Sequence, residues 1–238
     1  MQLQLLPILL TPTVVIAGII PTLSIPGLGG LPKTTSKSSA TATAVPISKP
    51  TGKAITSVSY AGSGCPSGTV SSSLSSDQTV ITLGFDDFQA YIGPGTILTD
   101  RSKSCKLLIT LNYPPGYSFG VVSSTYHGYA QLDVGVTGSF SSVYFLTSLL
   151  STTFSTSTSI LGGGAYSGGT VYTQTNTIST SNLVLSPCGL LGLGSRAGLN
   201  IAKTISLTSN NASATGQMTE DDATFGTTQR VSVKWFSC

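Results

Sequence analysis

The stretch SCKLLITLNYPPGYSFGV, residues 104–121, decides the fold class of this chain. In its first half every second residue from Cys105 onward is apolar, and this period of two places those side chains on one face of a β-strand. Residues 114–116, Pro-Pro-Gly, are a turn signal, and the alternation resumes from Tyr117 to Val121. The stretch therefore predicts two antiparallel strands joined as a hairpin.

Other segments have the same two-residue period and are separated by turn residues. No stretch between them has the 3.6-residue apolar period of an amphipathic helix. Short strands that alternate with turns are typical of two-layered β folds. We therefore expect an all-β protein with a single antiparallel β-sandwich or jelly-roll-like domain over residues 54–238. The further alternating segments are residues 79–85, 130–136, 199–207 and 231–235.

Charge is scarce in this chain and unevenly placed. Only 8% of the residues are charged, against about 25% in an average soluble protein. The formal net charge is +3, but four of the eleven basic residues lie in residues 33–53, and the other seven face eight acidic residues. Binding to phosphate backbones needs clustered Lys and Arg, which the rest of the chain lacks. The composition argues against nucleic-acid binding.

The first 53 residues have the features of an export signal followed by a linker. Residues 3–20 are almost wholly apolar, and the small residues Val15 and Ala17 suit cleavage after Ala17. We expect a signal peptide at residues 1–17 and no membrane span in the mature chain; a retained anchor is the less favoured alternative. Residues 18–53 are rich in Ser, Thr and Pro, which predicts an extended tether, with a propeptide as the competing interpretation. The expected location is secreted, either extracellular or in the cell wall.

Four cysteines remain after such cleavage, namely Cys65, Cys105, Cys188 and Cys238. An even number in an exported protein predicts two disulfides, for which three pairings exist. The pairing of Cys65 with Cys105 and of Cys188 with Cys238 is favoured because it closes the shorter loops. The spacing does not match a zinc site, and the single histidine cannot complete one. No metal or cofactor is predicted.

Several motifs in their order along the chain resemble the domain-of-unknown-function family 4360, a group of secreted fungal and bacterial proteins. The likeness covers about residues 60–238 and implies export and a four-cysteine β domain. It implies no reaction and no catalytic residue. The motifs are Gly-Cys-Pro-Ser-Gly at 64–68, Phe-Asp-Asp-Phe at 85–88 with Gly93, Arg101 to Cys105 with Leu111 and Pro-Gly at 115–116, Ser-Pro-Cys-Gly at 186–189, Leu-Asn-Ile at 199–201, and the C-terminal Val-Lys-Trp-Phe-Ser-Cys at 233–238.

One polar surface is predicted around the only histidine. If a strand runs through His127, then His127, Tyr129, Gln131 and Asp133 share the face opposite Ala130. Histidine is a frequent general acid or base, but no Gly-x-Ser-x-Gly turn supplies a nucleophile for a hydrolase. A solvated strand face or a binding surface is the favoured interpretation.

The carboxylates give a second candidate site. Asp86 and Asp87 follow a strand, where capping of a turn is the commoner role. A glycosidase would need one of them to face a second carboxylate across a cleft, and Asp133 or the acidic run 220–222 could supply it. The run 220–222 lacks the ligand spacing of a calcium-binding EF-hand loop, so a solvated loop is expected there.

Three further features bear on function. Asn211 begins an Asn-Ala-Ser sequon and is the predicted glycosylation site. The uncharged segment 148–181 is expected to be a mobile surface loop, with a pore-forming hairpin as the alternative. Tyr117, Tyr126 and Tyr129 are candidates for an exposed aromatic row that stacks against sugars.

The predicted function is that of a secreted, non-catalytic extracellular protein, associated with the cell wall or a glycan or acting at a host surface. Its partner would be a cell-wall polysaccharide or a host surface component. Two alternatives stay open at this point. One is a secreted glycan-active hydrolase that uses paired carboxylates, and the other is a host-directed effector or pore-forming toxin.

Overall fold

The computed structural model describes residues 52, 55–148, 152–188, 195–220 and 228–238. All of them belong to the unit Ala42–Cys238. The predicted signal peptide, and the predicted tether apart from Gly52, lie outside the described residues. Within the described ranges, no helix has the length and apolar character needed to cross a membrane.

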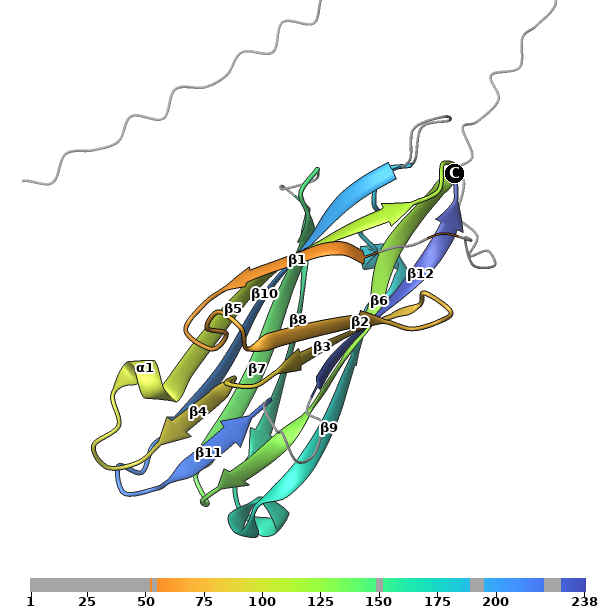
Figure 1. Cartoon of the computed structure of the whole chain (residues 1–238). Coiled ribbons are helices and arrows are strands. Elements are labelled where there is room, and N and C mark those ends of the chain that lie inside the picture. Colours follow the sequence, from red (N-terminus) through yellow and green to blue (C-terminus); the bar gives the residue numbers. More distant parts are fainter. Residues whose placement is uncertain (1–51, 53–54, 149–151, 189–194, 221–227) are drawn as a thin grey trace, which may run out of the picture. The chain divides into compact units, whose positions relative to one another are not determined.

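The described chain forms two antiparallel β-sheets (Figure 1). The five-stranded sheet has the order β1-β5-β10-β7-β8, and the seven-stranded sheet has the order β2-β3-β12-β6-β11-β4, with β9 pairing with β6. Three short helices, α1, η1 and η2, lie in the connections. The strands of the first sheet are β1 (Ile55–Ala61), β5 (Ser102–Tyr113), β7 (Val136–Leu146), β8 (Thr153–Leu161) and β10 (Ser195–Ser209). Those of the second are β2 (Val70–Leu74), β3 (Val80–Phe85), β4 (Gln89–Ile92), β6 (Tyr117–Leu132), β9 (Thr170–Thr177), β11 (Gly216–Thr219) and β12 (Thr228–Ser237). The helices are α1 (Leu98–Arg101), η1 (Gly164–Gly168) and η2 (Thr180–Asn182).

Aromatic side chains from the inner faces of both sheets meet in one core, which confirms the predicted β-sandwich. Tyr126 on β6 lies 4.9 Å from Phe140 on β7, measured between ring centroids. Near the other end of β6, Phe119 and Trp235 meet Tyr113 of β5 with centroid distances of 5.5 and 5.9 Å. Such tilted and edge-on contacts add stability beyond the burial of apolar area.

The predicted hairpin at residues 114–116 is wrong. β5 and β6 are both present, but β5 pairs with β1 and β10 while β6 pairs with β12, β11 and β9. The turn therefore carries the chain from one sheet to the other. A two-residue period identifies the buried face of a strand but not its neighbour, and two apolar faces can pack on each other as well as lie side by side.

A second turn between the sheets interrupts the alternation predicted over residues 130–136. β6 ends at Leu132 and β7 begins at Val136 in the other sheet. Val134, expected on the buried face, is 74% exposed. Gly135 has a φ of 89°, a backbone conformation that favours glycine and allows the tight reversal.

Both favoured disulfides are confirmed. Cys65 pairs with Cys105 and Cys188 with Cys238. The first bridge is buried and joins the loop after β1 to β5. The second is exposed and holds the C-terminal residue, whose N–H also donates to the carbonyl of Gly116 at 3.0 Å.

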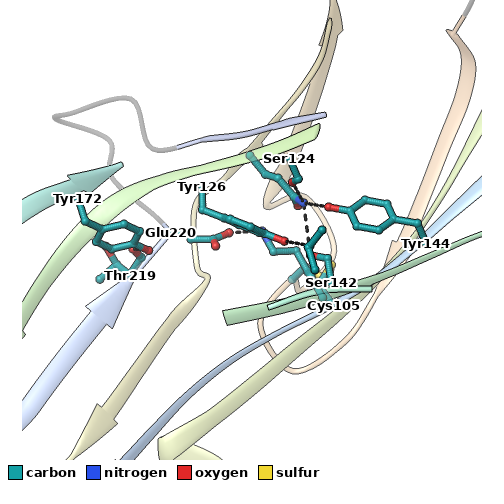
Figure 2. Close-up of polar contacts among 12 residues, drawn as sticks. Cys105, Ser124, Tyr126, Ser142, Tyr144, Tyr172, Thr219 and Glu220 are labelled. Carbon is teal, nitrogen blue, oxygen red and sulfur yellow. Dashed lines mark hydrogen bonds and ion pairs between the residues drawn. A yellow bond between two sulfur atoms is a disulfide. The ribbon is translucent and has the colours of Figure 1, made fainter. Parts of the chain in front are cut away.

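A group of buried polar side chains crosses the apolar core (Figure 2). The Gln229 amide on β12 donates to the hydroxyls of Ser124 and Tyr144, both at 2.9 Å. Because Tyr144 belongs to β7, this bond joins the two sheets. Lys203 on β10 forms an ion pair with Glu220, which follows β11, and this pair also spans the sandwich.

Candidate functional site on the outer sheet face

The outer face of the seven-stranded sheet has a set of tyrosine and glutamine side chains on three neighbouring strands. Tyr91 on β4 is level with Gln217 on β11 and Gln131 on β6. One step along, Gln89 is level with Thr219 and Tyr129 in the same way. We call Gln89, Tyr91, Tyr129, Gln131 and Gln217 the tyrosine–glutamine face.

The strands hold these side chains in defined positions. The Tyr91 hydroxyl hydrogen-bonds the Gln89 amide oxygen, and the Tyr129 hydroxyl donates to the Gln131 amide oxygen at 3.4 Å. Tyr91 is 41% exposed, which leaves part of its ring open to a ligand. From strand spacing and rise, the two tyrosines lie about 10 Å apart across the sheet and about 7 Å apart along it, or about 12 Å in all.

A shallow hollow of about 260 Å³ lies at one end of this face. Tyr91, Gln131 and Gln217 contribute to its lining, together with Asp133 and Thr215. The Asp133 carboxylate accepts hydrogen bonds from the Thr215 N–H at 2.7 Å and the Thr215 hydroxyl at 2.8 Å. These bonds lower the pKa of Asp133 because they favour its charged form. The hollow thus combines an aromatic ring, two amides and a fixed carboxylate.

His127 precedes Tyr129 by two residues on the same outer face of β6, at the point where β12 pairs with β6. Its Nδ1 hydrogen-bonds the Thr173 hydroxyl on β9 at 2.7 Å. Thr228 of β12 is level with His127 on its other side. The histidine is half-buried in this arrangement and links two strands, and it extends the polar face toward β9.

Asp86 and Asp87 lie elsewhere, exposed in the turn between β3 and β4. Ile92 on β4 and Leu132 on β6 are both level with the same residue of β11. Asp87 lies five residues before Ile92, and Asp133 lies one residue after Leu132. With a rise of about 3.3 Å per residue, Asp87 and Asp133 are about 20 Å apart along the strands, and paired glycosidase carboxylates are about 5–10 Å apart. These aspartates do not form such a pair.

Among the described residues, the acidic run 220–222 supplies no exposed carboxylate that could face Asp86 or Asp87. Glu220 is fully buried in its contact with Lys203, so the solvated loop expected for this run is wrong for Glu220. Asp221 and Asp222 lie outside the described residues. Nor does any group of three His, Cys, Asp or Glu side chains in the described ranges form a set that could hold a metal ion.

The described part of the segment 148–181 contains two strands, so the mobile surface loop expected there is wrong. Its strand β8 lies at the edge of the five-stranded sheet, and its strand β9 pairs with β6 in the other sheet. In this structure β8 and β9 are therefore not paired with each other as the strands of a hairpin would be, and the pore-forming alternative stays a prediction. A hollow of about 560 Å³ lies between β8 and the end of β9, lined by hydroxyl side chains with Phe154 and Ile178.

Two other predicted residues are placed clearly. Tyr126 is fully buried in the core, so the candidate row of Tyr117, Tyr126 and Tyr129 does not form on the surface. Asn211 is exposed in the turn after β10, where its side-chain oxygen accepts the Ser213 N–H at 3.0 Å. Its exposure is compatible with glycosylation, which stays a prediction.

The sequence interpretation missed Gln89, Tyr91 and Gln217. Their strands, β4 and β11, have only four residues each. The signal was present in Gln-Ala-Tyr-Ile at 89–92, where polar and apolar residues alternate. Four residues give too few repeats of the period to separate a short strand from a loop.

Comparison with known proteins identifies the family. Residues 52–238 match the family Domain of unknown function (DUF4360). The chain belongs to this family. This DUF4360 chain is also 40% identical, over 185 residues, to an uncharacterized secreted protein of Arthroderma benhamiae. The match covers 77% of this chain and 71% of that protein.

A comparison with solved structures finds a remote resemblance. The structure of TmCBM61 in complex with β-1,4-galactotriose matches 76% of this DUF4360 chain and 88% of its own chain, with 11% identity and a TM-score of 0.24. At that score the likeness carries no argument about the function of the DUF4360 protein.

Proposed function

We propose that this DUF4360 protein is a secreted, non-catalytic protein of the extracellular space or cell wall, and that its tyrosine–glutamine face binds a neutral polysaccharide. The carrying observation is the partly exposed Tyr91 ring, which lies level with Gln217 on the neighbouring strand and with Gln131 on the strand after it. Paired strands hold such a set in place before a ligand arrives, which reduces the entropy lost on binding.

The chemistry of the face suits a sugar chain. A sugar ring has an apolar C–H side that can stack on an aromatic ring, and hydroxyls that both donate and accept hydrogen bonds. Each glutamine amide can do both in return. None of the five side chains of the face is charged, and the nearby Asp133 carboxylate would repel an acidic sugar, so a neutral chain is favoured. The separation of about 12 Å between the tyrosines allows contact with more than one sugar unit.

Export is part of the same proposal. Residues 1–17 would be removed as a signal peptide, residues 18–53 would form the tether, and residues 54–238 would be the binding domain. Two disulfides are expected to persist only in an oxidising compartment. The name of the Arthroderma benhamiae relative, a secreted protein, supports this location.

The test is retention of the full chain on insoluble chitin, β-glucan and whole cell walls. We expect retention on at least one material and an approximately tenfold weaker affinity for Tyr91→Ala combined with Gln217→Ala, because a tenfold loss corresponds to about 1.4 kcal/mol of lost contacts. Depletion of protein from the supernatant over a range of polysaccharide concentrations measures the affinity.

Leu161→Ala is the matched control, because Leu161 is a 72% exposed apolar residue on the other sheet. It is expected to bind as the wild type does. The proposal fails if none of the three materials retains the wild-type protein, or if the double variant and the control bind equally well.

A further inference from the structure

The Lys203 side chain reaches from one sheet to the other through the centre of the core. Lys203 lies on β10 of the five-stranded sheet, and Glu220 follows β11 of the seven-stranded sheet. The Nζ atom of Lys203 is in direct contact with Oε2 of Glu220. The two side chains are 1% and 0% exposed, so both groups are removed from bulk water.

The surroundings hold this pair in place. The Lys203 Nζ lies 3.7 Å from the ring centroid of Phe85 and 4.5 Å from that of Phe88. The Glu220 backbone N–H donates to the Phe88 carbonyl at 2.9 Å. On β5, the residue level with Lys203 is Cys105, which is fixed by its disulfide. Figure 2 shows Tyr172 and Thr219 beside Glu220. The Tyr172 hydroxyl donates a hydrogen bond to the Thr219 carbonyl at 2.8 Å.

An ion pair is poorly satisfied at this position. Among the described residues, Oε1 of Glu220 has no hydrogen-bond partner. An ammonium group has three N–H donors, and among the described residues the Phe85 and Phe88 rings and a single hydrogen-bond acceptor, Glu220, face it. Charged groups that are buried with unpaired donors and acceptors cost several kcal/mol each.

Burial also changes the protonation of the two groups. It lowers the pKa of Lys203 and raises the pKa of Glu220, because in both cases removal from water disfavours the charged form. Transfer of one proton from the ammonium to the carboxylate gives a neutral amine in contact with a neutral carboxylic acid. An uncharged amine has the lone pair that nucleophilic attack on a carbonyl carbon requires.

We propose that Nζ of Lys203 and Cδ of Glu220 are joined by an intramolecular amide bond. In this step the Nζ–Cδ bond forms, and one N–H bond of Lys203 and the Cδ–OH bond of Glu220 break. The released proton and hydroxyl leave together as one water molecule. Nothing is oxidised or reduced, and no other reactant is needed.

The product accounts for the unusual features of the pair. The amide has no charge, and the unpartnered oxygen of Glu220 is no longer part of a buried carboxylate. The new bond ties β10 to the end of β11 and so joins the two sheets covalently, next to the Cys65–Cys105 bridge. The cross-link adds a constraint that reducing agents do not remove.

Intact-mass spectrometry of the reduced full chain tests this proposal. To keep glycans out of the measurement, the chain carries Asn211→Gln. We expect a mass about 18 Da below that calculated from the N-terminal residue present in the protein, which corresponds to the loss of one water. Lys203→Met in the same background is the control and should have its full sequence mass.

Trypsin digestion locates the bond. A free Lys203 permits cleavage after residue 203, whereas an acylated Lys203 leaves residues 197–230 as one peptide, because no other Lys or Arg lies between residues 204 and 229. The expected peptide lacks one water and gives no fragments from backbone cleavage between Lys203 and Glu220. The full sequence mass together with complete cleavage after Lys203 would overturn the proposal.

Discussion

Replacing Lys203 alone by methionine is expected to lower the free energy of unfolding by about 4 kcal/mol, because breaking a buried pair leaves its other member without compensation. Methionine fills a similar volume beside Phe85, so the loss reflects Glu220 rather than a cavity. Glu220 would then be a free carboxyl group, fully buried with neither an amide bond nor a cation to compensate it. Denaturant unfolding of the variant and the wild type measures the difference.

Lys234→Met provides the control, because Lys234 is exposed on β12. It should change the free energy of unfolding by less than about 0.5 kcal/mol, as surface substitutions usually do. The double variant Lys203→Met with Glu220→Leu is expected to regain at least about 2 kcal/mol over the single variant, since both buried polar groups are then gone. If Lys203→Met and Lys234→Met have the same free energy of unfolding, the buried Glu220 does not depend on Lys203 and the prediction is wrong.

Removal of the C-terminal disulfide should have an effect of similar size. Cys188 and Cys238 are 50 residues apart, and cross-linking a loop of this length is expected to contribute about 4 kcal/mol by restricting the unfolded chain. Both cysteines are exposed, so Cys188→Ser with Cys238→Ser places no new polar group in the core. Thermal and denaturant unfolding without reducing agent would measure the loss.

Ser237→Ala is the appropriate comparison, since it alters the same exposed terminus and keeps the bridge. It should leave the unfolding midpoint almost unchanged. If the double serine variant loses less than about 1 kcal/mol, the bridge does not restrict the unfolded chain as the loop-closure account requires.

The alternation of apolar residues was enough to predict the sandwich and the buried faces of its long strands. In β10, for example, Leu199, Ile201 and Leu207 all point into the core. The same alternation places Lys203 on that inner face, and the structure buries it there. A lysine at an inward position was therefore a readable signal, but its partner Glu220 lies 17 residues away and only the pairing of the sheets brings them together.

Strand neighbours could not be predicted from the same pattern. Residues 104–121 could form either a hairpin within one sheet or two strands that belong to different sheets. The two arrangements use similar turn residues, so the sequence of the turn does not distinguish them. What distinguishes them is the packing of Tyr113 on Trp235, which is 122 residues further along the chain in the other sheet. Contacts of such separation leave no local signal.

The tyrosine–glutamine face was predictable only in part. His127, Tyr129 and Gln131 lie on one long strand, so their shared face followed from the period of two. Tyr91 and Gln217 enter the face from two four-residue strands, which pair with each other and, through β11, with β6. Their contribution depends on strand order, which a single sequence does not specify.

The central claim is that this face binds a neutral sugar chain, and NMR titration tests it most directly. Backbone amide signals of the folded domain would be followed while soluble chitin or β-glucan oligosaccharides are added. The account predicts concentration-dependent shifts concentrated in β4, β11 and residues 127–133. Signals that do not move with any oligosaccharide, or shifts confined to β8 and residues 177–184, would contradict it.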